Sequence, residues 1–192
     1  MQNKIALMGV SGAGKDFIAN HLIKEFDYQR FSFSDQLKRI AAMIYPWLEK
    51  DYPPLVKEEP LNITLNSGEL ITKSPRDIWL HLNALRDIER DIYIRMLNEE
   101  ITNFKDKCKN ILISDIRSED EFKWCSSNGF KIIYIKANKK IYKSYTIDSQ
   151  ISEMASKADF IFENNFNGLD EFDLFYQDII SNNIICTSSD LI

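Results

Sequence analysis

The sequence predicts a three-layer α/β protein in which a five-stranded parallel sheet is covered by helices on both faces. Short apolar segments rich in Ile or Phe, bounded by polar or turn residues, recur along the chain and are typical of buried strands. Segments with helical spacing lie between them, and this alternation favours a parallel sheet. The 192 residues, 44% of them hydrophobic, suffice for one domain with a sizeable core, so we expect a single domain over residues 1–192.

The expected elements alternate in chain order. The strands are residues 4–9, 28–33, 110–115, 130–135 and 158–164. The helices are residues 16–25, 35–44, 75–105, 118–127 and 169–180. Two helix starts also carry a chemical signal, because Ser118 and Glu121 form the pattern of a capping box and Ser74 precedes a proline at the first helical position.

Residues 46–74 interrupt this alternation. Four prolines punctuate the stretch, and residues 62–72 resemble a small hairpin that turns at Asn66-Ser67-Gly68. One interpretation is a plain surface insertion. The other is an insertion on the substrate side, because long irregular segments in compact domains are often binding loops.

Composition excludes several classes of protein. The net charge is -5, so no global basic field would attract a nucleic acid. The three cysteines lie far apart without C-x-x-C spacing, which indicates neither a zinc site nor a disulfide framework and fits a reducing cytoplasm. The first apolar run is too short for a signal peptide or a membrane span, and we expect no membrane partner.

The first strong motif is GVSGAGK, residues 9–15, which has the G-x-x-x-x-G-K pattern of a phosphate-binding loop, or P-loop. An apolar strand leads into it and an amphipathic helix follows, so its backbone N–H groups would surround a phosphate at a helix N-terminus. Lys15 would add a positive charge at the β- and γ-phosphates. We assign ATP binding to Gly9, Val10, Ser11, Gly12, Ala13, Gly14, Lys15, Asp16 and Phe17.

Asp16 stands where the common P-loop has Ser or Thr. A carboxylate beside polyphosphate is repelled unless a cation lies between them. We therefore expect Asp16 to face Mg²⁺, a metal-bound water or a basic side chain.

The second motif is NILISD, in which four apolar residues end in Asp115. This is the Walker B pattern, where an acid at the carboxyl end of a strand orients Mg²⁺ or its water. Arg117 follows two residues later and would fork onto phosphate oxygens, the alternative being an ordinary surface salt bridge. Together the two motifs predict a P-loop NTPase fold with its ligand at the carboxyl ends of the strands.

A GTPase is discounted because Asn138-Lys139-Lys140-Ile141 lacks the Asp of N-K-x-D and the residues after Asp115 lack the Gly of D-x-x-G. A small-molecule kinase fits better. Lys38 and Arg76 open the second and third helices, and with Arg117 they would hold a second anionic group opposite the γ-phosphate. For each of these residues the alternative is a solvated surface charge.

The motifs G-x-x-x-x-G-K-D, F-S-D-x-L-K, S-P-R-D, S-D-I-R and a late S-E-M-A followed by ADFIFENNF resemble the phage-type deoxynucleoside monophosphate kinases through most of the chain. This resemblance implies a P-loop kinase fold of the nucleoside monophosphate kinase type with a lid. It also implies transfer of the ATP γ-phosphate to a deoxynucleoside 5′-monophosphate (dNMP), with ATP and Mg²⁺ as cofactors. Phosphomevalonate kinases share much of the pattern, including G-K-D-F and S-D-x-R, and are the rival interpretation.

The resemblance also implies roles for single residues. Lys15, Asp16 and Arg117 would be catalytic, and Asp16 and Asp115 would meet the metal through water. Residues 138–150 would form the lid, with Lys139, Lys140 and Lys143 closing over the phosphates, although a solvated helix face explains these lysines as well. The acceptor would contact Ser11, Leu37, Lys38, Arg76, Tyr93, Asp115 and Arg117.

Some details depart from the family or stay open. Ser11 occupies a position that is often basic in the family, and Leu82-Asn83 replaces its Leu-Gly. Tyr93 would stack on the acceptor base, the alternative being a core aromatic residue. The expected partners are ATP and the dNMP, the location is the cytoplasm, that of the host if the chain comes from a phage, and a homodimer remains open. A P-loop module that binds nucleotide without catalysis is the alternative from another class.

Overall fold

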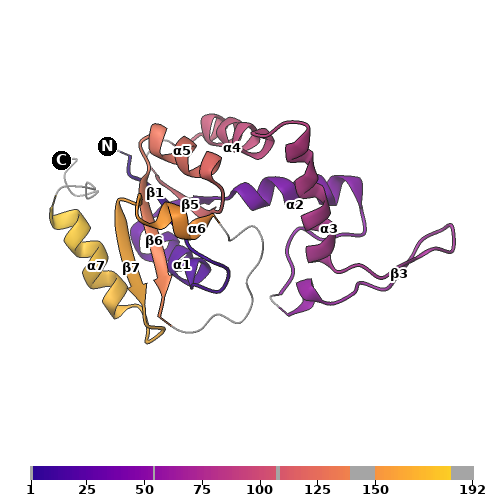
Figure 1. Ribbon diagram of the computed structural model, residues 1–192, viewed down its shortest axis with the longest axis horizontal. Coiled ribbons are helices and arrows are strands. Elements are labelled where there is room, and N and C mark those ends of the chain that lie inside the picture. Colours follow the sequence, from indigo (N-terminus) through magenta and orange to yellow (C-terminus); the bar gives the residue numbers. More distant parts are fainter. Residues whose placement is uncertain (1, 54, 107–108, 139–149, 183–192) are drawn as a thin grey trace. The chain divides into compact units, whose positions relative to one another are not determined.

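The computed structural model describes residues 2–53, 55–106, 109–138 and 150–182 (Figure 1). The chain divides into two compact units. Residues 1–32 and 101–192 form the sheet unit, and residues 33–100 form the helical unit. The predicted lid residues Lys139, Lys140 and Lys143 lie outside the described residues.

The sheet unit is built on five parallel strands in the order β2-β5-β1-β6-β7. The strands are β1 (Lys4–Met8), β2 (Tyr28–Phe31), β5 (Asn110–Ile116), β6 (Lys131–Ala137) and β7 (Phe160–Asn164). The helices are α1 (Lys15–Phe26), α5 (Glu119–Ser127), α6 (Ile151–Ala155) and α7 (Asp170–Ser181). The predicted α/β fold with a five-stranded parallel sheet is confirmed, and each predicted strand overlaps an observed one.

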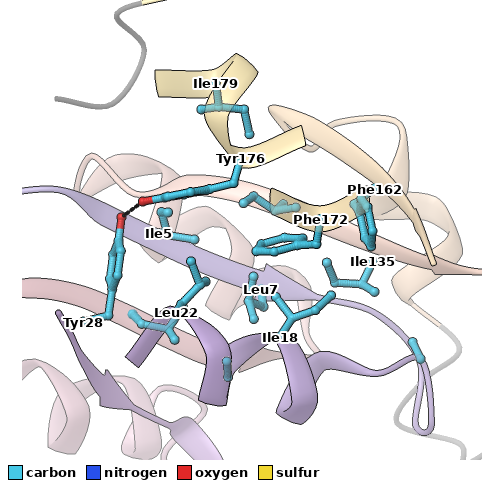
Figure 2. Close-up of a cluster of buried hydrophobic side chains, with 14 residues drawn as sticks. Ile5, Leu7, Ile18, Leu22, Tyr28, Ile135, Phe162, Phe172, Tyr176 and Ile179 are labelled. Atoms are coloured by element: carbon cyan, nitrogen blue, oxygen red, sulfur yellow. Dashed lines mark hydrogen bonds between the residues drawn. The ribbon is translucent and has the colours of Figure 1, made fainter. Parts of the chain in front are cut away.

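The main core of this unit lies between the sheet and helices α1 and α7 (Figure 2). Ile5 and Leu7 of β1 point into it, and Ala6 and Met8, which alternate with them, are equally buried on the opposite face. Both faces of the central strand are therefore covered, which explains why β1 reads as a continuous apolar run. Each buried Ile or Leu side chain stabilises the fold by ~1.5–3 kcal/mol.

One polar contact crosses this core. The hydroxyl of Tyr28 on β2 lies 2.8 Å from the hydroxyl of Tyr176 on α7, and both side chains are almost fully buried (Figure 2). Burial raises the pKa of both tyrosines, that of Tyr176 to about 12. Both hydroxyls are thus kept neutral and bonded to each other inside an apolar cluster.

Helix α5 packs against β6 and begins at the predicted capping box. The Ser118 hydroxyl accepts from the Glu121 N–H, and the Glu121 carboxylate accepts from the Ser118 N–H. Cys125, in the same helix, is fully buried. Among the described helices, none combines the length and hydrophobicity that a membrane crossing would need.

The helical unit contains α2 (Phe33–Ile44), α3 (Pro75–Leu82) and most of α4 (Ile92–Asn103), with short 3-10 turns at Val56–Glu58 and Asn83–Asp87. The predicted hairpin is present as β3 (Ile63–Thr64) paired antiparallel with β4 (Leu70–Ile71). Its turn closes through the Gly68 N–H and the Leu65 carbonyl. The core of this unit is rich in aromatic residues and comprises Leu37, Ala41, Leu48, Ile78, Trp79 and Tyr93.

The prediction of one helix over residues 75–105 is wrong. Helix α3 ends at Leu82, and α4 begins ten residues later at Ile92. The break is stabilised from the side, because the Tyr93 hydroxyl donates to the Leu82 carbonyl and the Arg86 guanidinium lies 4.9 Å from the centre of the Tyr93 ring. The Tyr93 hydroxyl therefore supplies a hydrogen bond to the Leu82 carbonyl at the end of α3. Helical periodicity, which continues across both segments, does not indicate this end.

Candidate nucleotide-binding site

The loop Gly9–Gly14 joins β1, the middle strand of the sheet, to α1. Two of its glycines, Gly9 and Gly14, are required by close approach. A Cβ atom at Gly9 would lie 2.7 Å from the Ile135 carbonyl oxygen, and one at Gly14 would clash with the Asn164 amide. Gly14 also has a φ of 95°, which favours glycine. The predicted P-loop pattern therefore corresponds to a tight turn between a strand and a helix.

Lys15 is the first residue of α1 and is only 6% exposed. Its Nζ atom donates to the carbonyl oxygens of Gly9, at 2.6 Å, and Val10, at 2.9 Å. The ammonium group is thus held at the loop itself rather than in solvent. A helix N-terminus with a fixed cation beside it is suited to an anionic group.

Asp16 and Phe17 follow in the first turn of α1, and both are exposed. In the described part of the chain the Asp16 carboxylate has no hydrogen-bond or ion-pair partner. The predicted basic neighbour is therefore not found there, and a cation or its water remains the expected partner.

Asp115 lies on β5 in an irregular part of the sheet. Ala6 is opposite Ile113 and Met8 is opposite Ile116, so Ser114 and Asp115 together face the single residue Leu7. Such a bulge re-aims side chains and is common beside active sites. Asp115 is 7% exposed, and its carboxylate accepts a hydrogen bond of 2.8 Å from the Ser32 hydroxyl.

Sequence patterns did not single out Ser32, which directly follows β2 and is buried. Its only signal is its position after a strand that pairs in parallel with β5, because the carboxyl ends of such strands meet at one sheet edge. Its hydroxyl orients the buried Asp115 carboxylate.

Arg117 follows the end of β5 at the start of α5. Its backbone N–H donates to the buried Glu121 carboxylate at 2.8 Å. The capping box thus fixes the backbone from which the partly exposed Arg117 side chain extends.

Four further predicted site residues belong to the helical unit, and one of them, Leu37, is part of its core. The Lys38 Nζ atom lies 3.3 Å from an Asp35 oxygen, 3.4 Å from an Asp51 oxygen and 5.4 Å from the Trp79 ring centre. Lys38 is therefore an internally paired cation.

Arg76 and Tyr93 are engaged within the helical unit as well. The Arg76 Nε atom donates to Glu58 at 2.6 Å. Tyr93 is 1% exposed and bonds to Leu82 as described above. Its stacking on an acceptor base stays a prediction, and the burial of the ring argues for the alternative of a core aromatic residue.

In the described ranges no group of three or more His, Cys, Asp or Glu side chains could hold a metal ion. Mg²⁺ in nucleotide sites is bound by one or two carboxylates together with phosphate oxygens and waters. Asp16, in the first turn of α1, and Asp115, near the end of β5, stay the predicted carboxylates of such a sparse ligand set.

No family model and no curated protein matches this sequence. Solved structures do match. Dephospho-CoA kinase from Campylobacter jejuni is 17% identical with a TM-score of 0.57, and the match covers 95% of this chain and all of that one. The chain therefore shares the α/β fold of that protein. TT1252 from Thermus thermophilus is 15% identical with a TM-score of 0.54, covering 94% of this chain and 97% of that chain.

Proposed function

We propose that this chain transfers the γ-phosphate of ATP to the 5′-phosphate of a deoxynucleoside monophosphate and so produces the diphosphate. The observation that carries the proposal is the loop between β1 and α1, in which Lys15 is held against the Gly9 and Val10 carbonyls. The motifs shared with phage-type deoxynucleoside monophosphate kinases along most of the sequence supply the substrate class.

The chemistry needs no general base. An oxygen of the acceptor phosphate, already deprotonated at neutral pH, attacks the γ-phosphorus, and the bond from that phosphorus to the β,γ-bridging oxygen breaks to release ADP. Catalysis then reduces to alignment and to neutralising charge on the phosphoryl group in transfer. We assign that charge to Lys15 and Arg117. Lys139, Lys140 and Lys143, which lie outside the described residues, are the proposed lid residues.

Mg²⁺ would neutralise part of the charge on the ATP phosphates. We propose that Asp16 and Asp115 hold it through water. The Ser32 hydroxyl supports this role because its hydrogen bond keeps the Asp115 carboxylate in one orientation.

For the acceptor we propose Lys38 and Arg76 as the cations, with Leu37, Tyr93 and Ser11 as the further contacts that the resemblance implies. In the structure Arg76 contacts Glu58, and Lys38 contacts Asp35 and Asp51. An acceptor phosphate would take the place of these carboxylates, since a guanidinium forks onto either group in the same geometry.

The test is ADP formation from ATP in the presence of Mg²⁺ and, separately, dAMP, dCMP, dGMP, dTMP and phosphomevalonate, with Lys15→Met as the blank. We expect at least one deoxynucleotide to stimulate ATP consumption and to appear as its diphosphate. Stimulation by phosphomevalonate alone would replace the proposed substrate with the rival one. Binding of ATP without stimulation by any acceptor would leave a non-catalytic nucleotide-binding module.

A further inference from the structure

Asn164, the last residue of β7, is a buried polar residue that contacts the P-loop without belonging to it. It is 7% exposed, and its Nδ2 atom donates to the Ala13 carbonyl oxygen at 2.9 Å. Its Oδ1 atom accepts from the Phe166 N–H at 2.9 Å, which fixes which end of the amide faces the loop. The contact joins residues 151 positions apart in the sequence.

The Ala13 carbonyl belongs to the same peptide group as the Gly14 N–H. In a trans peptide the C=O and N–H bonds point in opposite directions. Holding the Ala13 oxygen towards β7 therefore directs the Gly14 N–H away from β7. In a P-loop the N–H groups must converge on the phosphate, and a carbonyl oxygen turned into the same space would repel it.

Glycine at position 14 does little to resist rotation of the Ala13–Gly14 peptide. Gly14 has a φ of 95°, and glycine adopts φ of either sign at similar cost. The absence of a side chain at Gly14, which the approach of the Asn164 amide requires, thus also makes the peptide easy to flip. A specific hydrogen bond to the carbonyl is the simplest way to keep one orientation.

We propose that Asn164 is a positioning residue that locks the Ala13–Gly14 peptide in the orientation that binds phosphate. The proposal rests on nucleotide binding by the P-loop and not on the identity of the acceptor. The alternative is that Asn164 only packs β7 against the loop and that its loss weakens the whole fold.

Two near-isosteric variants test the lock. Asn164→Asp replaces the donor with an acceptor that repels the Ala13 oxygen, and Asn164→Leu removes the donor without adding charge. Asn167→Asp is the matched control, because it adds the same charge three residues away on an exposed side chain that contacts Glu171. Calorimetric titration with MgATP, magnesium tripolyphosphate and a dNMP gives the three dissociation constants, and thermal unfolding shows which variants are folded.

We expect both Asn164 variants to bind MgATP and tripolyphosphate about tenfold or more weakly, since a buried hydrogen bond is lost at the loop. The dissociation constant of the dNMP should stay the same, and Asn167→Asp should bind all three ligands like the wild type. Asn164→Ser, whose side chain is too short to reach Ala13, serves as a third variant if the first two do not fold.

Wild-type affinity for tripolyphosphate in a folded Asn164 variant would overturn the lock. An equal loss of affinity for tripolyphosphate and for the dNMP would also overturn the lock, and so would failure of all three variants to fold. Either result would mean that Asn164 contributes only to general stability. A wild-type protein that binds ATP and tripolyphosphate but phosphorylates no dNMP would overturn only the proposed acceptor. A wild-type protein that binds neither would overturn both proposals.

Discussion

The two units of the chain use polar groups in different ways. In the sheet unit, the candidate site is made largely of backbone. Its predicted side chains Lys15 and Asp115 are buried, and they bond to the loop carbonyls and to the Ser32 hydroxyl. In the helical unit, the candidate cations Lys38 and Arg76 are partly exposed and paired with carboxylates. A site made of backbone groups is formed as soon as the chain folds. A site made of paired side chains can bind a ligand only when the ligand replaces their present partners.

The largest expected effect lies in the sheet unit. Lys15→Met keeps the length of the side chain but removes the charge held at Gly9 and Val10. We expect turnover to fall about a thousandfold, the scale seen for single cations in phosphoryl transfer. Steady-state ADP formation measures it, and circular dichroism checks folding. Turnover within a few-fold of the wild type would move the charge-neutralising role away from this loop.

A second change tests the exposed acid beside that loop. Asp16→Asn and Asp16→Ser remove the carboxylate, which has no protein partner in the described residues. If it holds Mg²⁺ through water, the magnesium concentration for half-maximal activity should rise about tenfold or more. Glu25→Gln, an exposed acid at the other end of α1, is the control. Full activity with unchanged magnesium dependence would remove Asp16 from the metal site.

In the helical unit we expect a substitution to change the KM of the acceptor and not that of ATP. Arg76→Met should raise the KM of the acceptor about tenfold while leaving that of ATP unchanged, because a charge-assisted contact is worth roughly 1.5–3 kcal/mol. Glu58→Gln removes the negative charge that pairs with the Arg76 Nε atom and should not raise the acceptor KM. Arg95→Met, which breaks the exposed pair with Glu89, is the control.

If Arg76→Met and Glu58→Gln instead lower thermal stability to the same extent and leave every KM unchanged, the pair is structural. The helical unit would then contribute no cation to acceptor binding at this position.

A pH effect belongs to the core of the sheet unit. Burial raises the pKa of Tyr176 from 10.0 to about 12, and that of Tyr28 also rises. The unfolded chain loses these protons first as pH rises, so the free energy of unfolding is fully retained below pH about 10. Above that pH it falls, by roughly 3 kcal/mol for Tyr176 once the pH exceeds about 12. Urea unfolding at about pH 8 and pH 11 measures the difference. Tyr176→Phe should be less sensitive to alkali, and an equal sensitivity would point to other groups.

The smallest effect distinguishes packing from recognition at Tyr93. Tyr93→Phe loses the hydroxyl bond to the Leu82 carbonyl but keeps the buried ring. We expect the free energy of unfolding to fall by about 1 kcal/mol and the acceptor KM to stay constant. Tyr93→Leu, which removes the ring, extends the test, because a large rise in acceptor KM with unchanged stability would favour base stacking.

The elements that sequence predicted best are those specified locally. Apolar runs flanked by turns placed all five strands of the sheet, and the Ser118–Glu121 pattern placed the start of α5. The P-loop was predicted equally well, because neighbouring atoms come so close to positions 9 and 14 that only glycine fits there.

What sequence did not predict depends on contacts between distant residues. The break between α3 and α4 is held by Tyr93 reaching back to Leu82, which leaves the helical periodicity of both segments intact. The roles of Ser32 and Asn164 arise from strand order, since only the folded sheet brings Ser32 to Asp115 and Asn164 to Ala13. Two of the carboxylates that pair with Lys38 and Arg76, those of Asp51 and Glu58, come from the irregular segment 46–74. No periodic pattern in that segment indicates where its side chains lie.

The burial of Cys125 in α5 has a consequence for redox chemistry. Burial raises the pKa of this thiol well above its usual value, and the nearby carboxylates of Glu121 and Asp115 raise it further. Only the thiolate reacts readily with oxidants and alkylating reagents, so Cys125 is chemically silent as long as α5 stays packed. Because the capping box of the same helix holds the backbone of Arg117, modification of Cys125 would signal that α5 has opened and that this arginine has lost its anchor.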